Sequence, residues 1–234
     1  MNGKIITLEG IECSGKGEQS KRLLTYFQQL GQPVVLTREP GGSVYSEALR
    51  TIIKHPQQAI NGLAEVFNGH EDFPQTMATI DYFSRSGYCE LFMFLAARAE
   101  LVSKLIKPGL LKGQIIIIDR SLDSTRAYQG GGRFNSDPQI IATINLLNEI
   151  ALQGVKPDLT IFLDIAIETM IARRIKSKTK DAHFEETCDR EFFARTRNEY
   201  LSIARDEPKR FRVIDGEQTI DQVWTDIRTL VLEL

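Results

Sequence analysis

The sequence has no excess of basic residues. Among its 234 residues, 29 are lysine or arginine and 31 are aspartate or glutamate, so the formal net charge is −2. A protein that holds a polynucleotide by charge needs a basic excess, because it must neutralise many backbone phosphates. We therefore expect no polynucleotide partner, and we expect any bound anion to be met by a local cluster of donors.

Long apolar runs and paired cysteines are also missing. No stretch approaches the roughly 20 apolar residues that a membrane-spanning helix needs, and the apolar run at the N-terminus stops at Glu9, too early for a secretory signal. Cys13, Cys89 and Cys188 are widely spaced and form no C-x-x-C pair, which favours reduced thiols over a disulfide or a zinc site. These features predict a cytoplasmic protein with no membrane partner.

What the sequence does contain is an alternation of short apolar runs with longer helical patterns. Residues 5–8, 34–36, 115–118, 159–163 and 211–214 are typical of strands, and the four consecutive isoleucines at 115–118 are typical of a strand covered on both faces. Helical patterns follow through about Gln29, between residues 90 and 112, and from 220 to 230. The alternation predicts an α/β three-layer fold, with a five-stranded parallel sheet and helices on both faces.

One segment does not follow this scheme. Residues 55–89 are interrupted by glycine and proline and show no sustained period. Connections of this length are uncommon unless they are functional or mobile. We therefore expect residues 1–234 to form a single domain with an atypical insertion at about 55–89.

The first expected strand runs into a glycine-rich segment that matches G-x-x-x-x-G-K. Its glycines allow backbone N–H groups to surround an anion, the following helix adds its positive end, and the lysine adds a full charge. This places the fold in the P-loop NTPase type and predicts a phosphate-binding loop made of Gly10, Ile11, Glu12, Cys13, Ser14, Gly15, Lys16 and Gly17.

The position after the lysine departs from the P-loop rule. The rule places serine or threonine there to contact Mg²⁺, whereas this chain has Gly17 followed by Glu18. The metal must then depend on phosphate oxygens, water and a carboxylate elsewhere. We predict Asp119, at the end of the third strand, for that task, with Glu12 as the other candidate, either of them acting through water.

Further motifs follow in a fixed order along the chain. They are Thr37-Arg38-Glu39-Pro40-Gly41-Gly42, residues 90–98 (ELFMFLAAR), residues 119–125 (DRSLDST), residues 127–133 (AYQGGGR), residues 156–160 (KPDLT), Leu163-Asp164 and residues 193–197 (FARTR). Together with residues 9–16, these segments resemble bacterial thymidylate kinases. The resemblance covers nearly the whole chain except residues 55–89.

The resemblance implies an enzyme that transfers the γ-phosphoryl group of ATP to dTMP, giving dTDP, with Mg²⁺ as cofactor and a homodimer as the assembly. Its catalytic residues would be Lys16, Arg38, Asp119 and Arg120. Arg38 and Arg120 would grip the acceptor phosphate, since guanidinium groups match phosphate oxygens. Arg120 would also neutralise charge that develops during transfer.

The same resemblance assigns the acceptor nucleoside. Phe94 would stack on thymine, and Arg98, one helical turn further on, would donate to a base carbonyl. Tyr128 would crowd C2′ of the sugar, and Glu12 would face the 3′-hydroxyl or a metal-bound water. Base recognition would be completed by Ser124, Thr125 and Gln129.

A basic run after the fourth strand is similar to the family's lid, expected at about 174–187. It contains Lys178 and Lys180, and its cations Arg173, Arg174 and Lys176 are expected to bind ATP. His183 stands where the family's pattern places arginine, so the sequence leaves open which cation acts.

Two other functions stay open from the sequence. Gly17 after Lys16 is also what adenylate kinases show, which leaves another nucleoside monophosphate or deoxynucleoside kinase as an alternative. Gly17, Glu18 and the altered lid also allow a nucleotide-binding protein that has lost catalysis.

Overall fold

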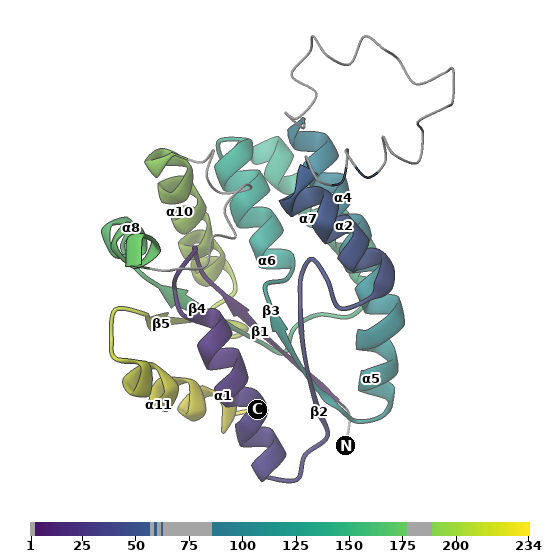
Figure 1. Cartoon of the computed structure of the whole chain (residues 1–234), viewed down its shortest axis with the longest axis vertical. Coiled ribbons are helices and arrows are strands. Elements are labelled where there is room, and N and C mark those ends of the chain that lie inside the picture. Colours follow the sequence, from purple (N-terminus) through teal and green to yellow (C-terminus); the bar gives the residue numbers. More distant parts are fainter. Residues whose placement is uncertain (1–2, 57–58, 60–61, 63–85, 177–188) are drawn as a thin grey trace.

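The centre of the molecule is one parallel β-sheet. A computed structural model describes residues 3–56, 59, 62, 86–176 and 189–234. In these residues the strands are ordered β2-β3-β1-β4-β5, and every neighbouring pair is parallel (Figure 1). The five-stranded parallel sheet predicted from the sequence is confirmed. Its strands are β1 (Lys4–Glu9), β2 (Val34–Arg38), β3 (Ile115–Asp119), β4 (Leu159–Asp164) and β5 (Phe211–Asp215).

Helices cover both faces of the sheet, as the isoleucine run of β3 indicates. Because successive side chains of a strand point to opposite faces, Ile117 packs with α1 (Lys16–Gln29) and α11 (Ile220–Val231), and Ile118 packs on the other side. The second face is covered by α4 (Gly87–Leu101), η2 (Val102–Ile106), α5 (Lys107–Leu111), α7 (Pro138–Leu152) and α10 (Arg190–Asp206).

The helix expected between residues 90 and 112 is longer and less regular than predicted. It begins at Gly87, inside the expected insertion, because the Ser86 hydroxyl caps it by accepting from the Cys89 N–H at 3.1 Å. Its middle, η2, is a π-helical segment. Pro108 lies two residues beyond η2, in the first turn of α5, and its ring nitrogen cannot donate a helical hydrogen bond.

Several helices were not assigned from the sequence. Besides α7 and α10 these are α2 (Val44–Lys54), α6 (Leu122–Ser124), η3 (Thr125–Arg133) and α8 (Ile167–Lys176). Residues 63–85 of the expected insertion and 177–187 of the expected lid lie outside the described residues. In the part of the chain that is described, no helix has both the length and the apolar character that crossing a bilayer requires.

A run of glycines brings η3 against α10. A Cβ atom on Gly132 would lie 2.4 Å from the Phe192 ring, and one on Gly131 would lie 3.0 Å from the Glu199 Cβ. Larger residues would push the two helices apart. Because η3 carries Tyr128, this close packing sets one wall of the site described next.

Candidate functional site

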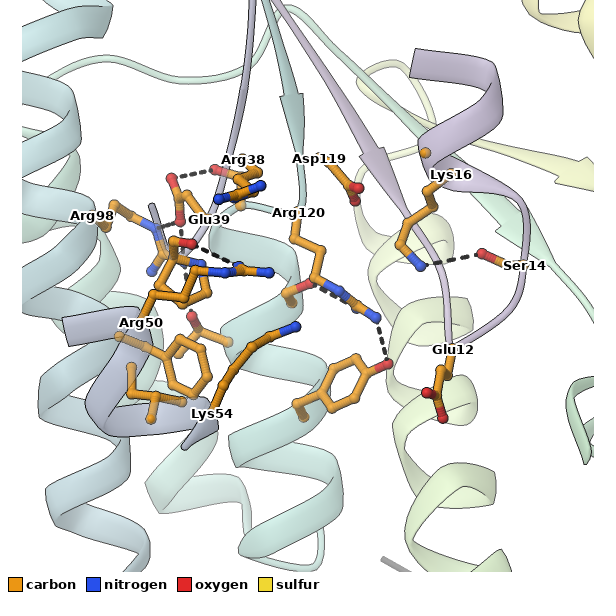
Figure 2. A pocket seen from close by; sticks show the side chains of 18 of the residues that line it. Glu12, Ser14, Lys16, Arg38, Glu39, Arg50, Lys54, Arg98, Asp119 and Arg120 are labelled. Atoms are coloured by element: carbon orange, nitrogen blue, oxygen red, sulfur yellow. Dashed lines mark hydrogen bonds and ion pairs between the residues drawn. The ribbon is translucent and has the colours of Figure 1, made fainter. Parts of the chain in front are cut away.

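A cavity of about 360 Å³ opens at the carboxyl ends of β1, β2 and β3 (Figure 2), where parallel α/β sheets normally bind ligands. It brings together most of the residues predicted from the sequence: Glu12, Cys13, Ser14, Gly15, Lys16, Gly17, Arg38, Phe94, Arg98, Asp119, Arg120, Ser124, Thr125, Tyr128 and Gln129. The predicted residues that do not line it are Gly10, Ile11, Arg173, Arg174 and Lys176.

The loop between β1 and α1 has the shape of a phosphate-binding loop. Gly10 has φ 149°, and a Cβ there would lie 2.5 Å from the Ser14 Oγ and 2.8 Å from the Leu163 carbonyl, so only glycine fits. The Lys16 ammonium donates to the carbonyls of Gly10 at 3.1 Å and Ile11 at 2.9 Å. The loop is therefore closed around its lysine.

Arg120 links this loop to η3. Its Nη1 donates to the Gly10 carbonyl at 3.0 Å, and its Nη2 donates to the Tyr128 hydroxyl at 2.9 Å. The guanidinium also lies 4.7 Å from the centre of the Tyr128 ring. Arg120 thus stands between the phosphate-binding loop and the wall formed by η3, where it can reach ligands on both sides.

Two further arginines approach the cavity from the β2 side. Arg38 forms an ion pair with Glu47 at 3.2 Å, and Glu47 also accepts from the Gly42 N–H at 2.8 Å. Arg50, on α2, donates to the Pro40 carbonyl at 2.8 Å. Arg50 was not predicted, although a helical reading of the residues after Gly42 places it on one face of a helix with Lys54.

Arg98, predicted to contact the base, is almost completely buried. The residue is 1% exposed, its Nε donates to Glu39 at 2.7 Å, and its Nη1 and Nη2 donate to Asn148 at 2.6 Å and Thr125 at 2.9 Å. Burial raises the pKa of Glu39, and the Arg98 charge opposes that rise. The guanidinium therefore holds β2, η3 and α7 together, while its contact with a base stays a prediction.

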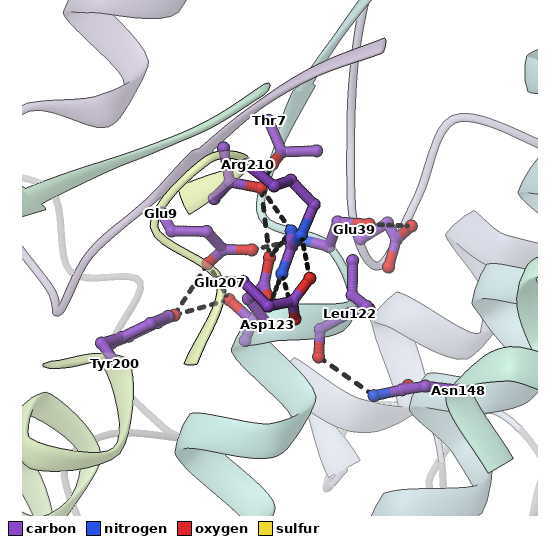
Figure 3. Close-up of polar contacts among 12 residues, drawn as sticks. Thr7, Glu9, Glu39, Leu122, Asp123, Asn148, Tyr200, Glu207 and Arg210 are labelled. Carbon is purple, nitrogen blue, oxygen red and sulfur yellow. Dashed lines mark hydrogen bonds and ion pairs between the residues drawn. The ribbon is translucent and has the colours of Figure 1, made fainter. Parts of the chain in front are cut away.

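The buried carboxyl group of Glu9, at the end of β1, accepts hydrogen bonds from the segment that follows Arg120. The Glu9 Oε1 accepts from the Ser121 N–H at 2.7 Å, and its Oε2 accepts from the hydroxyls of Ser124 at 2.6 Å and Tyr200 at 2.7 Å (Figure 3). Burial is the main cause that raises the pKa of Glu9 to about 7, and the nearby Asp123 carboxylate is the second. Ser124 is thus tied to the sheet as well as lining the cavity.

Asp123 is neutralised by Arg210, the residue directly before β5. Both Nη atoms of Arg210 donate to Asp123 at 2.8 Å, and the Thr160 hydroxyl donates to it at 3.2 Å. Arg210 also pairs with Glu207 at 2.8 Å (Figure 3). This paired network fixes the start of α6, and with it the position of the segment that follows Arg120.

Of the two residues predicted to support Mg²⁺, Asp119 and Glu12, the surroundings of Asp119 fit a nearby cation. The Asp119 Oδ1 is buried and accepts no hydrogen bond from the residues that the structure describes, a costly arrangement that a cation or a metal-bound water would relieve. Glu12 instead has Arg174 at 3.6 Å. Within the described ranges no group of three or more His, Cys, Asp or Glu side chains could hold a metal.

The basic residues of α8 lie beside the loop, outside the cavity. Arg173 donates to the Cys13 carbonyl at 3.2 Å and to the Gly216 carbonyl at 2.9 Å, so it ties α8 to the phosphate-binding loop. Lys176, the last residue of α8, is exposed. Lys178, Lys180 and His183 lie outside the described residues.

Some cavity residues were not identified from the sequence. The cavity is also lined by Glu18, Glu39, Pro40, Arg50, Ile53, Lys54 and Ser121. The motif containing Glu39 was recognised, but nothing local shows that its side chain turns inward to meet Arg98. A glycine-rich loop closed around a lysine between β1 and α1, opening onto a cavity with several arginines, defines a P-loop nucleotide-binding protein.

Comparison with known proteins gives the family. The model of the thymidylate kinase family matches residues 8–68 and 75–227. The thymidylate kinase of Symbiobacterium thermophilum is 35% identical over 98% of this chain and 92% of its own length, and that of Kosmotoga olearia is 34% identical over 93% and 90%. The crystal structure of thymidylate kinase from Ehrlichia chaffeensis aligns over 100% of both chains with a TM-score of 0.68 and 30% identity. The chain belongs to the thymidylate kinase family.

Proposed function

We propose that this protein transfers the γ-phosphoryl group of ATP to dTMP, giving dTDP, with Mg²⁺ as cofactor. The observation that carries the proposal is a single cavity that joins a phosphate-binding loop, with Lys16, to a second set of cations from β2, α2 and β3. Two phosphate-bearing substrates need such an arrangement, since their charges repel. Membership of the thymidylate kinase family supports dTMP as the acceptor.

Transfer would need little covalent chemistry from the protein. Lys16 and the loop N–H groups bind the β- and γ-phosphates, while Arg38 and Arg50 bind the acceptor phosphate. Arg120, held between both sides, neutralises charge as the phosphoryl group moves. Asp119 would hold Mg²⁺ through water, and the metal, when bound, would supply further neutralisation of the phosphate charge. The acceptor phosphate is itself the nucleophile, so no general base is required.

The acceptor nucleoside would lie between α4 and η3. Phe94 stacks on the base, Gln129 and Thr125 border it, and Tyr128 excludes a 2′-hydroxyl. The Tyr128 ring is 4% exposed and contacts Phe192 and Tyr200 edge-on, so it is held in place. A residue fixed in this way can select by shape, because the ring cannot move aside for a larger sugar.

A homodimer is part of the proposal. Neighbouring helices α2, α4 and α7 carry large apolar side chains in solvent: Val44, Tyr45, Phe92, Leu146 and Ile150, all more than half exposed. Exposed apolar patches of this kind commonly mark protein interfaces. We also propose that the chain acts as one domain and works in the cytoplasm, without a polynucleotide partner.

The test is a coupled assay of ATP turnover with each common nucleoside monophosphate, with and without Mg²⁺. We expect dTMP to be phosphorylated with the highest kcat/KM, and only with a divalent metal. A higher kcat/KM for another monophosphate would reassign the acceptor. A protein that binds ATP but phosphorylates no monophosphate with any metal would instead be a nucleotide-binding protein without catalysis.

A further inference from the structure

Lys54 is a cavity residue that neither the phosphate-binding loop nor the other motifs include. It is the last residue of α2, it is half-buried, and it lines the cavity. Figure 2 shows its side chain extending from the end of α2 into the opening that Arg50 and Arg120 also enter. A lysine at this point brings a full positive charge to the wall opposite the phosphate-binding loop.

The wall made by α2 and α4 carries two cations, Arg50 and Lys54, beside Arg98, whose own charge is balanced by Glu39 at 2.7 Å. These two helices contribute Arg50, Ile53, Lys54, Phe94 and Arg98 to the lining, and none of these side chains is acidic. Arg50 and Lys54 are four residues apart, so they lie on one face of α2, where like charges repel. Both also line the cavity, so a phosphate bound there would be within reach of two cations.

The position of this wall is fixed before any ligand binds. The Ser46 hydroxyl donates to the Ala97 carbonyl at 2.7 Å and so ties α2 to α4. Ile53, next to Lys54, is 1% exposed. An anchored helix spares the ligand the entropic cost of ordering the chain, and only the flexible Lys54 stem must then adjust.

A lysine in the last turn of a helix also has an ordinary explanation, because it interacts favourably with the negative end of the helix. Lys112, directly after α5, is the matched case: it is exposed and does not line the cavity. Removal of Lys112 should therefore show what the helix-end effect alone contributes.

We propose that Lys54 binds the phosphate of the acceptor nucleotide together with Arg50, and thereby selects a nucleoside monophosphate over the nucleoside. This rests on the proposed function, since it takes the acceptor to lie against α2 and η3. The ammonium donates charge-assisted hydrogen bonds to the phosphate oxygens. The base and the sugar contribute nothing to this contact, so its effect should follow the phosphate alone.

The experiment compares Lys54→Met, Lys54→Arg and Lys112→Met by calorimetric titration with dTMP, thymidine and ATP, each without the second substrate. We expect Lys54→Met to weaken dTMP binding about tenfold or more, the usual size of a hydrogen bond to a charged group. Binding of thymidine and of ATP should stay within about twofold. Lys54→Arg should restore most of the dTMP affinity, and Lys112→Met should bind all three ligands as the unchanged protein does.

Two results would overturn the proposal. Unchanged dTMP affinity in Lys54→Met, with a lower unfolding temperature, would leave Lys54 with only its helix-end role. An equal loss for thymidine would mean that Lys54 contacts the nucleoside. Because binding is measured without turnover, an unaltered protein that binds dTMP but does not phosphorylate it would refute the proposed function and still allow this test.

Discussion

At the scale of single residues, Asp119 carries the clearest chemical prediction. Magnesium prefers anionic oxygen ligands or waters held by them, and Gly17 supplies no hydroxyl. Asp119→Asn keeps the shape and removes the charge. We expect kcat/KM to fall at least a hundredfold, about 2.7 kcal/mol of transition-state stabilisation, when dTMP phosphorylation is measured at saturating Mg²⁺.

The control for this measurement is Asp215→Asn. Asp215 also ends a strand, β5, but it is exposed and does not line the cavity. It should keep its activity within about threefold. An Asp119→Asn protein as active as its parent would move the metal's protein partner elsewhere, with Glu12 the next to test.

Glu9 should make stability depend on pH. Its pKa is raised from 4.5 to about 7 in the folded protein, mainly by burial. Below pH 4.5 the group is protonated in both states. As pH rises toward 7 the unfolded chain loses the proton first, so the free energy of unfolding falls, by roughly 3 kcal/mol at most.

Glu9→Gln should abolish this dependence, since it cannot ionise. Chemical denaturation of both proteins between pH 5 and 8 measures the difference. The stability of Glu9→Gln relative to the unchanged protein should rise from pH 5 to about 7 and then level off. A difference that stays constant across this range would show that Glu9 is ionised throughout, stabilised by the Ser121, Ser124 and Tyr200 donors.

At the scale of elements, the first turn of α1 has space for a side chain at Gly17, the position where the P-loop rule places serine or threonine. A Cβ atom on Gly17 would meet no atom of the described residues within 4 Å. Serine also has a better helix propensity than glycine, by a few tenths of a kcal/mol. We expect Gly17→Ser to keep dTMP phosphorylation within a few-fold and to unfold at the same temperature or slightly higher.

Gly10→Ser is the matched comparison. There the side chain would meet Ser14 and the Leu163 carbonyl, and the φ of 149° is unfavourable for serine. This variant should lose both activity and thermal stability. If Gly17→Ser fails as severely, the backbone at Gly17 must adopt a ligand-bound conformation that only glycine permits.

At the scale of the whole molecule, the exposed apolar side chains of α2, α4 and α7 predict self-association. Stable interfaces bury about 800 Å² on each partner, and a charge at the centre of an apolar interface opposes association. We expect the protein to sediment as a dimer at micromolar concentration and Ile150→Glu to sediment as a monomer. Ile220→Glu, on α11 and also more than half exposed, should stay dimeric. A monomeric parent protein would refute the interface.

Features that depend on neighbouring residues could be predicted from the sequence alone. The isoleucines at 115–118 predicted a strand buried on both faces, and the glycine spacing of residues 10–16 predicted a phosphate-binding loop between a strand and a helix; the strand and the placing of that loop are confirmed. Both signals are local, because alternation along a strand and the turn of a loop are set by adjacent residues.

Contacts between side chains that are distant in the sequence depend on how the whole chain folds. Arg98 pairs with Glu39, 59 positions away, and Glu9 accepts from Tyr200, 191 positions away. The repeat pattern of a helix or strand carries no information about such long-range pairs. The burial of Arg98 and the raised pKa of Glu9 were therefore not predicted. The entry of Arg50 and Lys54 into the cavity was missed for the same reason: a helix's own sequence shows which residues share a face, and only its packing against α4 decides what that face meets.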